Sequence, residues 1–310
     1  MSADIKEIVK QIYGPIIKYR HPIRDPGLAV RVLRDEYRLI VDTRKVALAF
    51  AAFYNGRPVL FEGPPGTGKT EIGYAILELW AGKTPFLLPC SENYDEYRVI
   101  GDFHPLMAMQ RGFTEESFIP RVILAAMILG SGVLVDDVRR SSEELQNLLL
   151  DIIDKRRIVV PELRRTFYTD DPGFQFIFTS NPDDIAQNEL SDAFLRRVVR
   201  IDFDYPDPSL EEEIVKIRML DEPLLPGDVL SRMKQVIGRL RKTAFYKPGT
   251  ADLVLWTKLA QSLAKMRGSD RVSRRDAYES AWSVLYKRIE DGELIARVLE
   301  EVLGIGGEKS

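Results

Sequence analysis

The sequence predicts an α/β fold in which a parallel sheet is followed by an all-helical domain. Short apolar runs such as RPVLFEG, VLVD and FQFIFTSN alternate with helical patterns up to residue 205. Strands that alternate with helices form mostly parallel sheets covered on both faces. From YPDPS at residues 205–209 onward, only helical patterns follow, to about residue 303. We therefore expect a first domain at residues 1–205, a helical domain at 206–303 and a flexible tail at 304–310.

Each expected element has a local signal. Residues 1–56 have helical patterns, and Gly56 is a typical helix stop. Apolar runs predict strands, and 3.6-residue periodicity predicts helices between them. Ser141 with Glu144, and Ser209 with Glu212, have the spacing of helix-capping pairs. The expected strands are residues 57–63, 85–90, 133–136, 174–181 and 198–203, and the expected helices between them include 71–80, 122–130 and one beginning near Ser141.

The composition excludes several classes of protein. A net charge of -3 argues against a dedicated nucleic-acid binder, which would normally be basic. The single cysteine, Cys90, excludes internal disulfides and fits a reducing compartment. The sequence contains two histidines, too few for a His-rich metal site. It has no signal-peptide pattern and no stretch of ~18 apolar residues, so we expect a cytoplasmic protein without membrane segments.

The strongest motif is GPPGTGKT, which follows an expected strand and opens an expected helix. It matches the phosphate-loop pattern G-x-x-x-x-G-K-[ST] in full. Glycines let backbone N–H groups approach a phosphate, and the helix N-terminus adds partial positive charge. Lys69 can reach the β- and γ-phosphates, and the Thr70 hydroxyl can ligate Mg²⁺. The predicted nucleotide-binding residues are Gly63, Pro64, Pro65, Gly66, Thr67, Gly68, Lys69, Thr70 and Glu71.

Two adjacent acids, Asp136 and Asp137, end the apolar run VLVD. A phosphate loop requires an acid at the end of a neighbouring strand that holds Mg²⁺, and Asp136 is the candidate. Asp137 can then face the γ-phosphate and orient an attacking water. Mg²⁺ and Lys69 would offset the repulsion between the two carboxylates. An acidic turn after a strand is the alternative without a function.

The motifs together resemble the MoxR family of AAA+ ATPases. The resemblance rests on GPPGTGKT, VLVDDVRRSSEELQNLLLDIIDKRRI, FQFIFTSNP and LSDAFLRRV, and it covers residues 35–205 well. It implies an α/β nucleotide domain, a helical lid and a ring, usually of six subunits, that binds ATP with Mg²⁺. It also implies chaperone-like remodelling of protein clients, often with a von Willebrand A domain partner.

The resemblance assigns further roles. Asn181 is similar to the sensor residue beside the γ-phosphate. Arg197, with Arg196 as the second candidate, lies in the region of the arginine finger that reaches the neighbouring subunit's nucleotide. Leu39, Ile40 and Val41 fall where the family lines its base pocket, although apolar residues are more often plain core. The segment at residues 93–113, rich in aromatic residues and Met, resembles the family's pore-facing insert and is the candidate for client contact, with ordinary loop packing as the alternative.

The sequence also departs from the family pattern. Asp137 stands where the family usually has Glu, and a ~1 Å displacement of a catalytic group costs about a hundredfold in rate. Arg139 replaces a usual Asn and adds positive charge, which we expect near the subunit edge. Thr250 falls where a sensor arginine begins a lid helix, and Lys247 is a nearby substitute.

Three hypotheses follow from these features. The first is a ring ATPase that remodels partner proteins. The second is a nucleotide-gated binding module that hydrolyses ATP slowly, as the short Asp137 and Thr250 suggest. The third is a nucleic-acid motor, against which the acidic net charge weighs.

Overall fold

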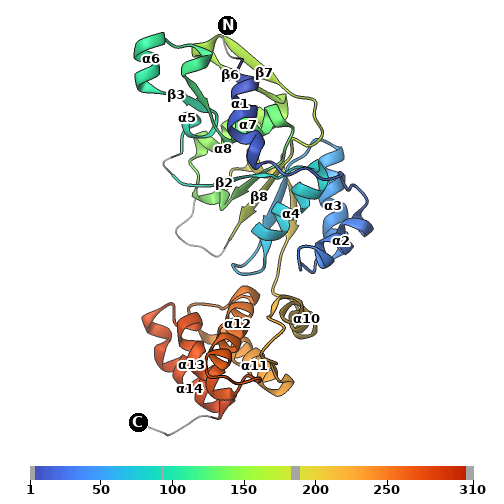
Figure 1. Ribbon diagram of the computed structural model, residues 1–310, viewed down its shortest axis with the longest axis vertical. Helices are drawn as coiled ribbons and strands as arrows, with labels where there is room; N and C mark the ends of the chain where they lie inside the picture. The colour runs from blue at the N-terminus through green and yellow to red at the C-terminus, as the bar shows by residue number, and fades with distance from the viewer. Residues whose placement is uncertain (1–3, 93, 183–188, 305–310) are drawn as a thin grey trace. The chain divides into compact units, whose positions relative to one another are not determined.

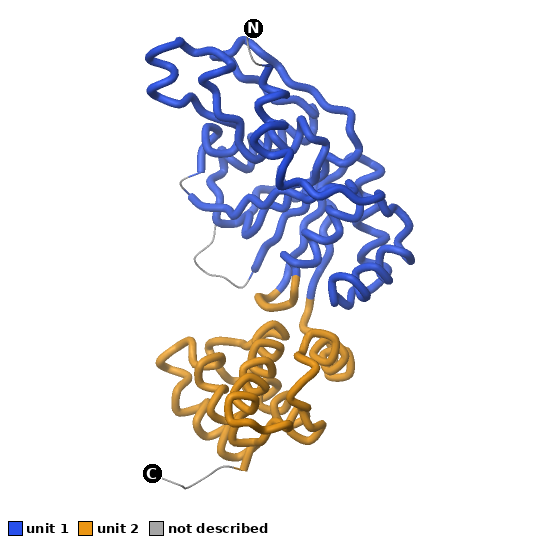
Figure 2. Tube along the Cα trace, in the orientation of Figure 1, with its two compact units in different colours: residues 1–63, 69–203 blue, residues 64–68, 204–310 orange. Residues whose placement is uncertain are grey.

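The computed structural model describes residues 4–92, 94–182 and 189–304 (Figure 1). The chain divides into two compact units, residues 1–63 with 69–203 and residues 64–68 with 204–310 (Figure 2). The expected tail at 304–310 lies, apart from Gly304, outside the described residues. No helix in the described part of the chain has the length and apolar character needed to cross a bilayer.

The first unit is built on a five-stranded sheet with the order β2-β5-β8-β1-β9. All four pairings are parallel, so the expected parallel sheet is confirmed. The register places Glu62, Ser180 and Asp202 side by side at the carboxyl ends of three strands. In open α/β sheets, ligands bind beyond this edge. The strands are β1 (Val59–Glu62), β2 (Phe86–Pro89), β5 (Val133–Asp136), β8 (Phe176–Ser180) and β9 (Val199–Asp202).

Helices cover both faces of this sheet, as Figure 1 shows. Successive residues of a strand point to opposite faces, so a continuous apolar run can bury both. Leu60 and Phe178 belong to one apolar core, and Phe61 and Ile177 to the other. The first core includes residues of α1 (Ile5–Tyr13), α7 (Val122–Leu129) and α8 (Glu143–Lys155), and the second includes residues of α2 (Pro26–Asp35), α3 (Thr43–Tyr54) and α4 (Lys69–Ala81).

Two predicted helix starts are wrong by one or two residues. Ser142, not Ser141, caps α8, because its side chain accepts a hydrogen bond from Leu145 N. The Ser141 hydroxyl instead donates to Val138 O within the preceding turn. Asp207, not Ser209, caps α10 (Pro208–Arg218). In both places a neighbouring side chain of equal capping strength takes the position.

The sequence did not predict two small antiparallel hairpins in the first unit. In one hairpin, β3 (Gly101–Phe103) pairs with β4 (Phe118–Pro120), and the connection between the two strands contains α6 (Pro105–Arg111). The other pairs β6 (Arg157–Val160) with β7 (Arg165–Tyr168). The segment expected as a single insert, of which Asn93 is not described, therefore folds into α5 (Glu96–Val99), β3 and α6.

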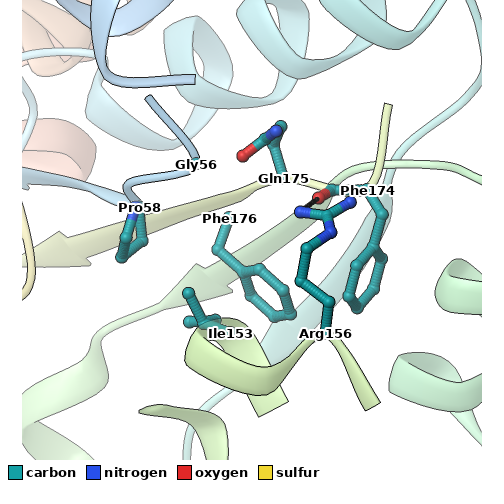
Figure 3. A pocket seen from close by; sticks show the side chains of 7 residues that line it. All are labelled: Gly56, Pro58, Ile153, Arg156, Phe174, Gln175 and Phe176. Atoms are coloured by element: carbon teal, nitrogen blue, oxygen red, sulfur yellow. Dashed lines mark hydrogen bonds between the residues drawn. The ribbon is translucent and has the colours of Figure 1, made fainter. Parts of the chain in front are cut away.

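Arg156 holds the amino end of β8 in place, at the opposite end of the strand from Ser180. Its guanidinium donates to the backbone oxygens of Thr169, Asp171 and Phe174 at 3.1, 2.7 and 3.3 Å. Figure 3 shows this guanidinium beside Phe174 and Phe176, where these residues line a small cavity. Arg156 has a left-handed backbone, with a φ of 46°.

The second unit is helical, as the sequence predicts. Its core includes the fully buried Trp256, whose indole N–H donates to Ala277 O at 2.8 Å. A buried indole N–H normally requires such a partner. The helices are α10, α11 (Gly227–Thr243), α12 (Thr250–Met266), α13 (Arg274–Leu285) and α14 (Gly292–Leu303).

Candidate nucleotide-binding site

The phosphate loop, residues 63–70, leaves β1 at Glu62 and enters α4 at Lys69. Gly63 has a φ of 153°, and a Cβ there would lie 1.8 Å from Phe203 O. Gly68 also has a positive φ, of 86°. The loop therefore requires glycine at both positions, at Gly63 because of a close backbone approach and at Gly68 because of its left-handed conformation.

Lys69 is buried, with 8% of its surface exposed. Its ammonium donates to Gly63 O at 2.7 Å. Burial lowers the pKa of Lys69 from its ordinary value, while the charges of Asp137, Asp136 and Glu62 act in the opposite direction. A buried ammonium attracts an added anion such as a phosphate.

Thr70 and Asp136, the two predicted metal ligands, lie in direct contact. Thr70 Oγ1 donates to Asp136 Oδ1 at 2.7 Å. Hydroxyl and carboxylate oxygens are the hard ligands that Mg²⁺ prefers, usually with phosphate oxygens and water completing the shell. No cluster of three or more His, Cys, Asp or Glu suited to a metal occurs among the described residues. A hydroxyl and a carboxylate supply two oxygen ligands, which leaves positions in an octahedral shell for phosphate oxygens and water.

The acid turn, residues 136–141, has an unusual backbone at the second acid. Asp137 is left-handed, with φ and ψ of 55° and 54°, and it precedes the 3-10 turn η3 (Val138–Arg140). Few non-glycine residues adopt this conformation, although Asp tolerates it better than most. The Asp137 carboxylate lies 3.4 Å from Arg140 Nε in an exposed ion pair.

Thr179, on β8, bonds to both acids, and sequence reasoning missed it. Its hydroxyl donates to Asp136 Oδ1 at 2.6 Å and accepts from Asp137 N at 2.9 Å. The side chain is 1% exposed. A polar residue near the end of a buried strand, one strand away from the acids, is the signal that could have identified it.

Glu62 is a second functional candidate that the sequence did not reveal. Its carboxylate, 2% exposed, accepts hydrogen bonds from Arg139 and Ser180 and forms an ion pair with Arg200. Arg139 is largely buried in this ion pair, with 18% of its side chain exposed, so its charge is paired within the unit. The buried acid attracts the guanidinium inward, because a buried charge is stable only when it is paired.

The remaining predicted residues have different surroundings. Asn181 directly follows β8 at the same sheet edge, half-buried. Leu39 and Val41 are buried in an apolar core, Ile40 is half-buried, and Glu71 is exposed. For the three predicted base-pocket residues, the packing of two of them in the core favours the plain-core alternative.

The two candidate finger arginines follow the short helix α9 (Asp192–Leu195). Arg197 Nε lies 2.9 Å from Asp154 Oδ2, and Arg197 Nη1 donates to Ala193 O. Arg196 is exposed, and its side chain forms no hydrogen bond or ion pair in the described part of the chain. Of the two candidates, Arg196 is the more exposed.

In the helical unit, Thr250 is buried and its hydroxyl donates to Glu211 Oε1 at 2.8 Å. Arg241 forms an ion pair with the same buried carboxylate at 2.6 Å. The substitute candidate, Lys247, is exposed. The Thr250 hydroxyl is therefore part of the lid's own buried polar network.

Comparisons with known proteins agree with this geometry. Residues 58–198 match the AAA domain of the dynein-related subfamily. The gas vesicle ATPase GvpN of Ancylobacter aquaticus is 28% identical over 177 residues, which cover 53% of this chain and 50% of that protein. Protein CbbQ of Hydrogenophilus thermoluteolus is 27% identical over 167 residues, 53% of this chain and 60% of that protein. The matched segment thus spans about half of these curated relatives.

Proposed function

Because this chain belongs to the AAA+ proteins of the MoxR-like type, we propose that it binds ATP with Mg²⁺ and hydrolyses the terminal phosphate. The observation that carries the proposal is the 2.7 Å hydrogen bond from Thr70 to Asp136. These residues are 66 positions apart in the sequence, and their contact joins the phosphate loop to the acid pair.

Each residue of the site has a proposed task in binding. Lys69 would exchange Gly63 O for the β- and γ-phosphate oxygens, which would favour its charged form. Thr70 and Asp136 would hold Mg²⁺, directly or through water, and the bound ion would offset phosphate charge. The two side chains need little movement to bind the ion, because the Thr70 hydroxyl and the Asp136 carboxylate are already in contact.

The proposed hydrolytic step uses the residues beyond the strand ends. Asp137 would accept a hydrogen bond from the attacking water and take up its proton. Asn181 would orient the same water from the end of β8. An arginine from a neighbouring subunit of a ring, which we propose to have six members, would stabilise the transferring phosphate. Arg196 is the better candidate because Arg197 is held by Asp154.

Client remodelling is the further part of the proposal. A groove of about 590 Å³ lies between the two hairpin insertions, and its lining includes Phe103, Met109, Phe113 and Glu162. Met109 is 85% exposed and Phe113 is 68% exposed. Exposed apolar groups of this size favour contact with another protein, either a client or a partner with a von Willebrand A domain.

A nucleotide-gated module that hydrolyses ATP slowly is the second candidate function. The left-handed Asp137, with its short side chain, favours this alternative. A comparison of turnover by the wild type and by Asp137→Glu separates the two. A glutamate variant at least tenfold faster supports the slow module, and equal or lower turnover counts against it.

ATP turnover in a matched pair of lysine variants tests the proposed function. Lys69 begins α4, whereas Lys83 follows its last turn and pairs with Asp171 at 3.2 Å. Phosphate release with Mg²⁺ should fall at least about a hundredfold in Lys69→Ala, as expected when a phosphate-binding charge is lost. Lys83→Ala should keep the wild-type rate. Equal rates in the wild type and Lys69→Ala would contradict the proposal.

A further inference from the structure

A buried ion-pair network links three parts of the candidate site through Glu62. Arg139 Nη2 lies 2.7 Å from Glu62 Oε1, and Arg200 Nε lies 2.9 Å from Glu62 Oε2. Ser180 Oγ donates to Glu62 Oε1 at 3.2 Å. Glu62 precedes the phosphate loop, and Ser180 precedes Asn181. One carboxylate therefore connects the loop, the acid turn and the end of β8.

Arg139 makes two separate contacts in this network. While Nη2 pairs with Glu62, its Nε donates to Ser180 Oγ at 2.7 Å. The planar guanidinium can direct two donors at two fixed acceptors, but a lysine ammonium is a single point charge on a flexible stem. The contacts thus need arginine rather than a cation in general.

The acid turn also contacts the sheet at other points. Asp137 N donates to Thr179, and Val138 is fully buried. Arg140, the last residue of η3, is exposed. The Arg139 side chain extends from this turn to β1. It is two residues beyond Asp137, so its position constrains the backbone that sets the direction of that acid.

We propose that Arg139 is a positioning residue that fixes the reach of Asp137. By joining the acid turn to Glu62 and Ser180, it keeps Asp137 left-handed and directs the short carboxylate toward the site. The inference rests on the proposed ATP hydrolysis for its kinetic consequence. Arg139 would thus hold the backbone of Asp137 rigidly, which compensates for a side chain one methylene shorter than that of Glu.

The network allows Arg139 to be replaced without loss of the fold. Arg200 Nε lies 2.9 Å from Glu62 Oε2, so we expect the buried carboxylate to keep a cationic partner in a variant without Arg139. A buried charge left with no partner would be far more damaging. Arg139→Met removes both donors while keeping much of the apolar stem.

The kinetic test compares Arg139→Met with a matched arginine. Arg156 is also partly buried and donates to three backbone oxygens, but it lies at the other end of β8 (Figure 3). In Arg139→Met, kcat should fall about 10- to 100-fold, as a ~1 Å misplacement costs up to a hundredfold. KM should stay within about twofold, because phosphate binding is unchanged. Arg156→Met should lose stability and keep kcat.

A double-mutant cycle with Asp137→Glu tests positioning directly. The longer acid depends less on backbone support. In the Asp137→Glu background, Arg139→Met should therefore lower kcat by less than about threefold. The kcat of Arg139→Lys should be close to that of Arg139→Met rather than to that of the wild type. An equal loss of kcat in both backgrounds, a wild-type kcat in Arg139→Met, or a rise in KM alone would overturn the inference.

Amide hydrogen exchange tests the inference without ATP hydrolysis. Arg140 N and Ser141 N donate to Asp137 O and Val138 O within the acid turn. Exchange of these amides should accelerate at least about tenfold in Arg139→Met and stay unchanged in Arg156→Met, because local opening sets the rate. Unchanged exchange in Arg139→Met would overturn the inference. A wild type without turnover would instead refute the proposed function.

Discussion

Replacing Thr179 by valine tests whether one buried hydroxyl sets the geometry of both acids. Valine has nearly the same shape, so the substitution removes the hydroxyl with little change in packing. Two hydrogen bonds are lost, one of 2.6 Å to Asp136 Oδ1 and one of 2.9 Å from Asp137 N. The backbone N–H of Asp137 then needs another partner, whereas Asp136 Oδ1 keeps its hydrogen bond from Thr70.

The expected cost follows from these two bonds. A hydrogen bond to a charged group contributes about 1.5–3 kcal/mol, and a neutral one about 1 kcal/mol. Asp137 is half-buried, so water can replace part of the loss. We expect Thr179→Val to lower the free energy of unfolding by about 2–3 kcal/mol and kcat by about 10- to 100-fold.

Urea denaturation and Mg²⁺-dependent phosphate release measure the two effects. Thr179→Ser keeps the hydroxyl and loses one methyl group, at about 0.8 kcal/mol, so it should retain most of the turnover. If Thr179→Val hydrolyses ATP at the wild-type rate, the hydroxyl does not position the acids. The same conclusion follows if Thr179→Ser loses as much turnover as Thr179→Val.

Three other outcomes follow from the structure. ATP with Mg²⁺ at 100 times its dissociation constant should stabilise the wild type by about 2.7 kcal/mol in a thermal-shift assay, and should leave Lys69→Ala unshifted. Burial, followed by the charges of Asp136 and Asp137, raises the pKa of Cys90 to about 12, so the folded protein keeps a proton that the unfolded chain loses. The free energy of unfolding should therefore fall as pH rises from about 9 toward 12, and Cys90→Ala should weaken that fall in pH-dependent denaturation. Thr250→Val removes a donor from buried Glu211 and should lower the stability of the helical unit by about 1–2 kcal/mol in calorimetry, whereas an unchanged transition would show that Arg241 alone satisfies this carboxylate.

The sequence predicts the sheet well because its strands are continuous apolar runs between helices. VLFE, VLVD and FIFTS each form a central parallel strand.

The two hairpins could not be predicted in this way. Strands β3 and β4 have three residues each, and β3 includes the polar Asp102, so periodicity does not distinguish them from loops. Their stability comes from pairing with each other, which a local pattern does not contain.

The candidate site likewise has parts that the sequence predicts and parts that it does not. GPPGTGKT and the paired acids are local motifs, so the sequence indicates them directly. The contact between Arg139 and Glu62 joins residues 77 positions apart, and that of Thr179 with Asp136 joins residues 43 apart. Only the register of the sheet brings them together. The choice between Arg196 and Arg197 likewise depends on Asp154, on a different helix.

The most direct test of the central claim separates ATP binding from ATP cleavage in Asp137→Asn. This variant keeps the size of the side chain and removes its ability to accept a proton. We expect this variant to bind a fluorescent ATP analogue within about twofold of the wild type, because the loop and the Mg²⁺ ligands are intact. Its Mg²⁺-dependent phosphate release should fall at least about a hundredfold. Wild-type turnover in Asp137→Asn would contradict the claim that this acid completes an ATP-hydrolysing site.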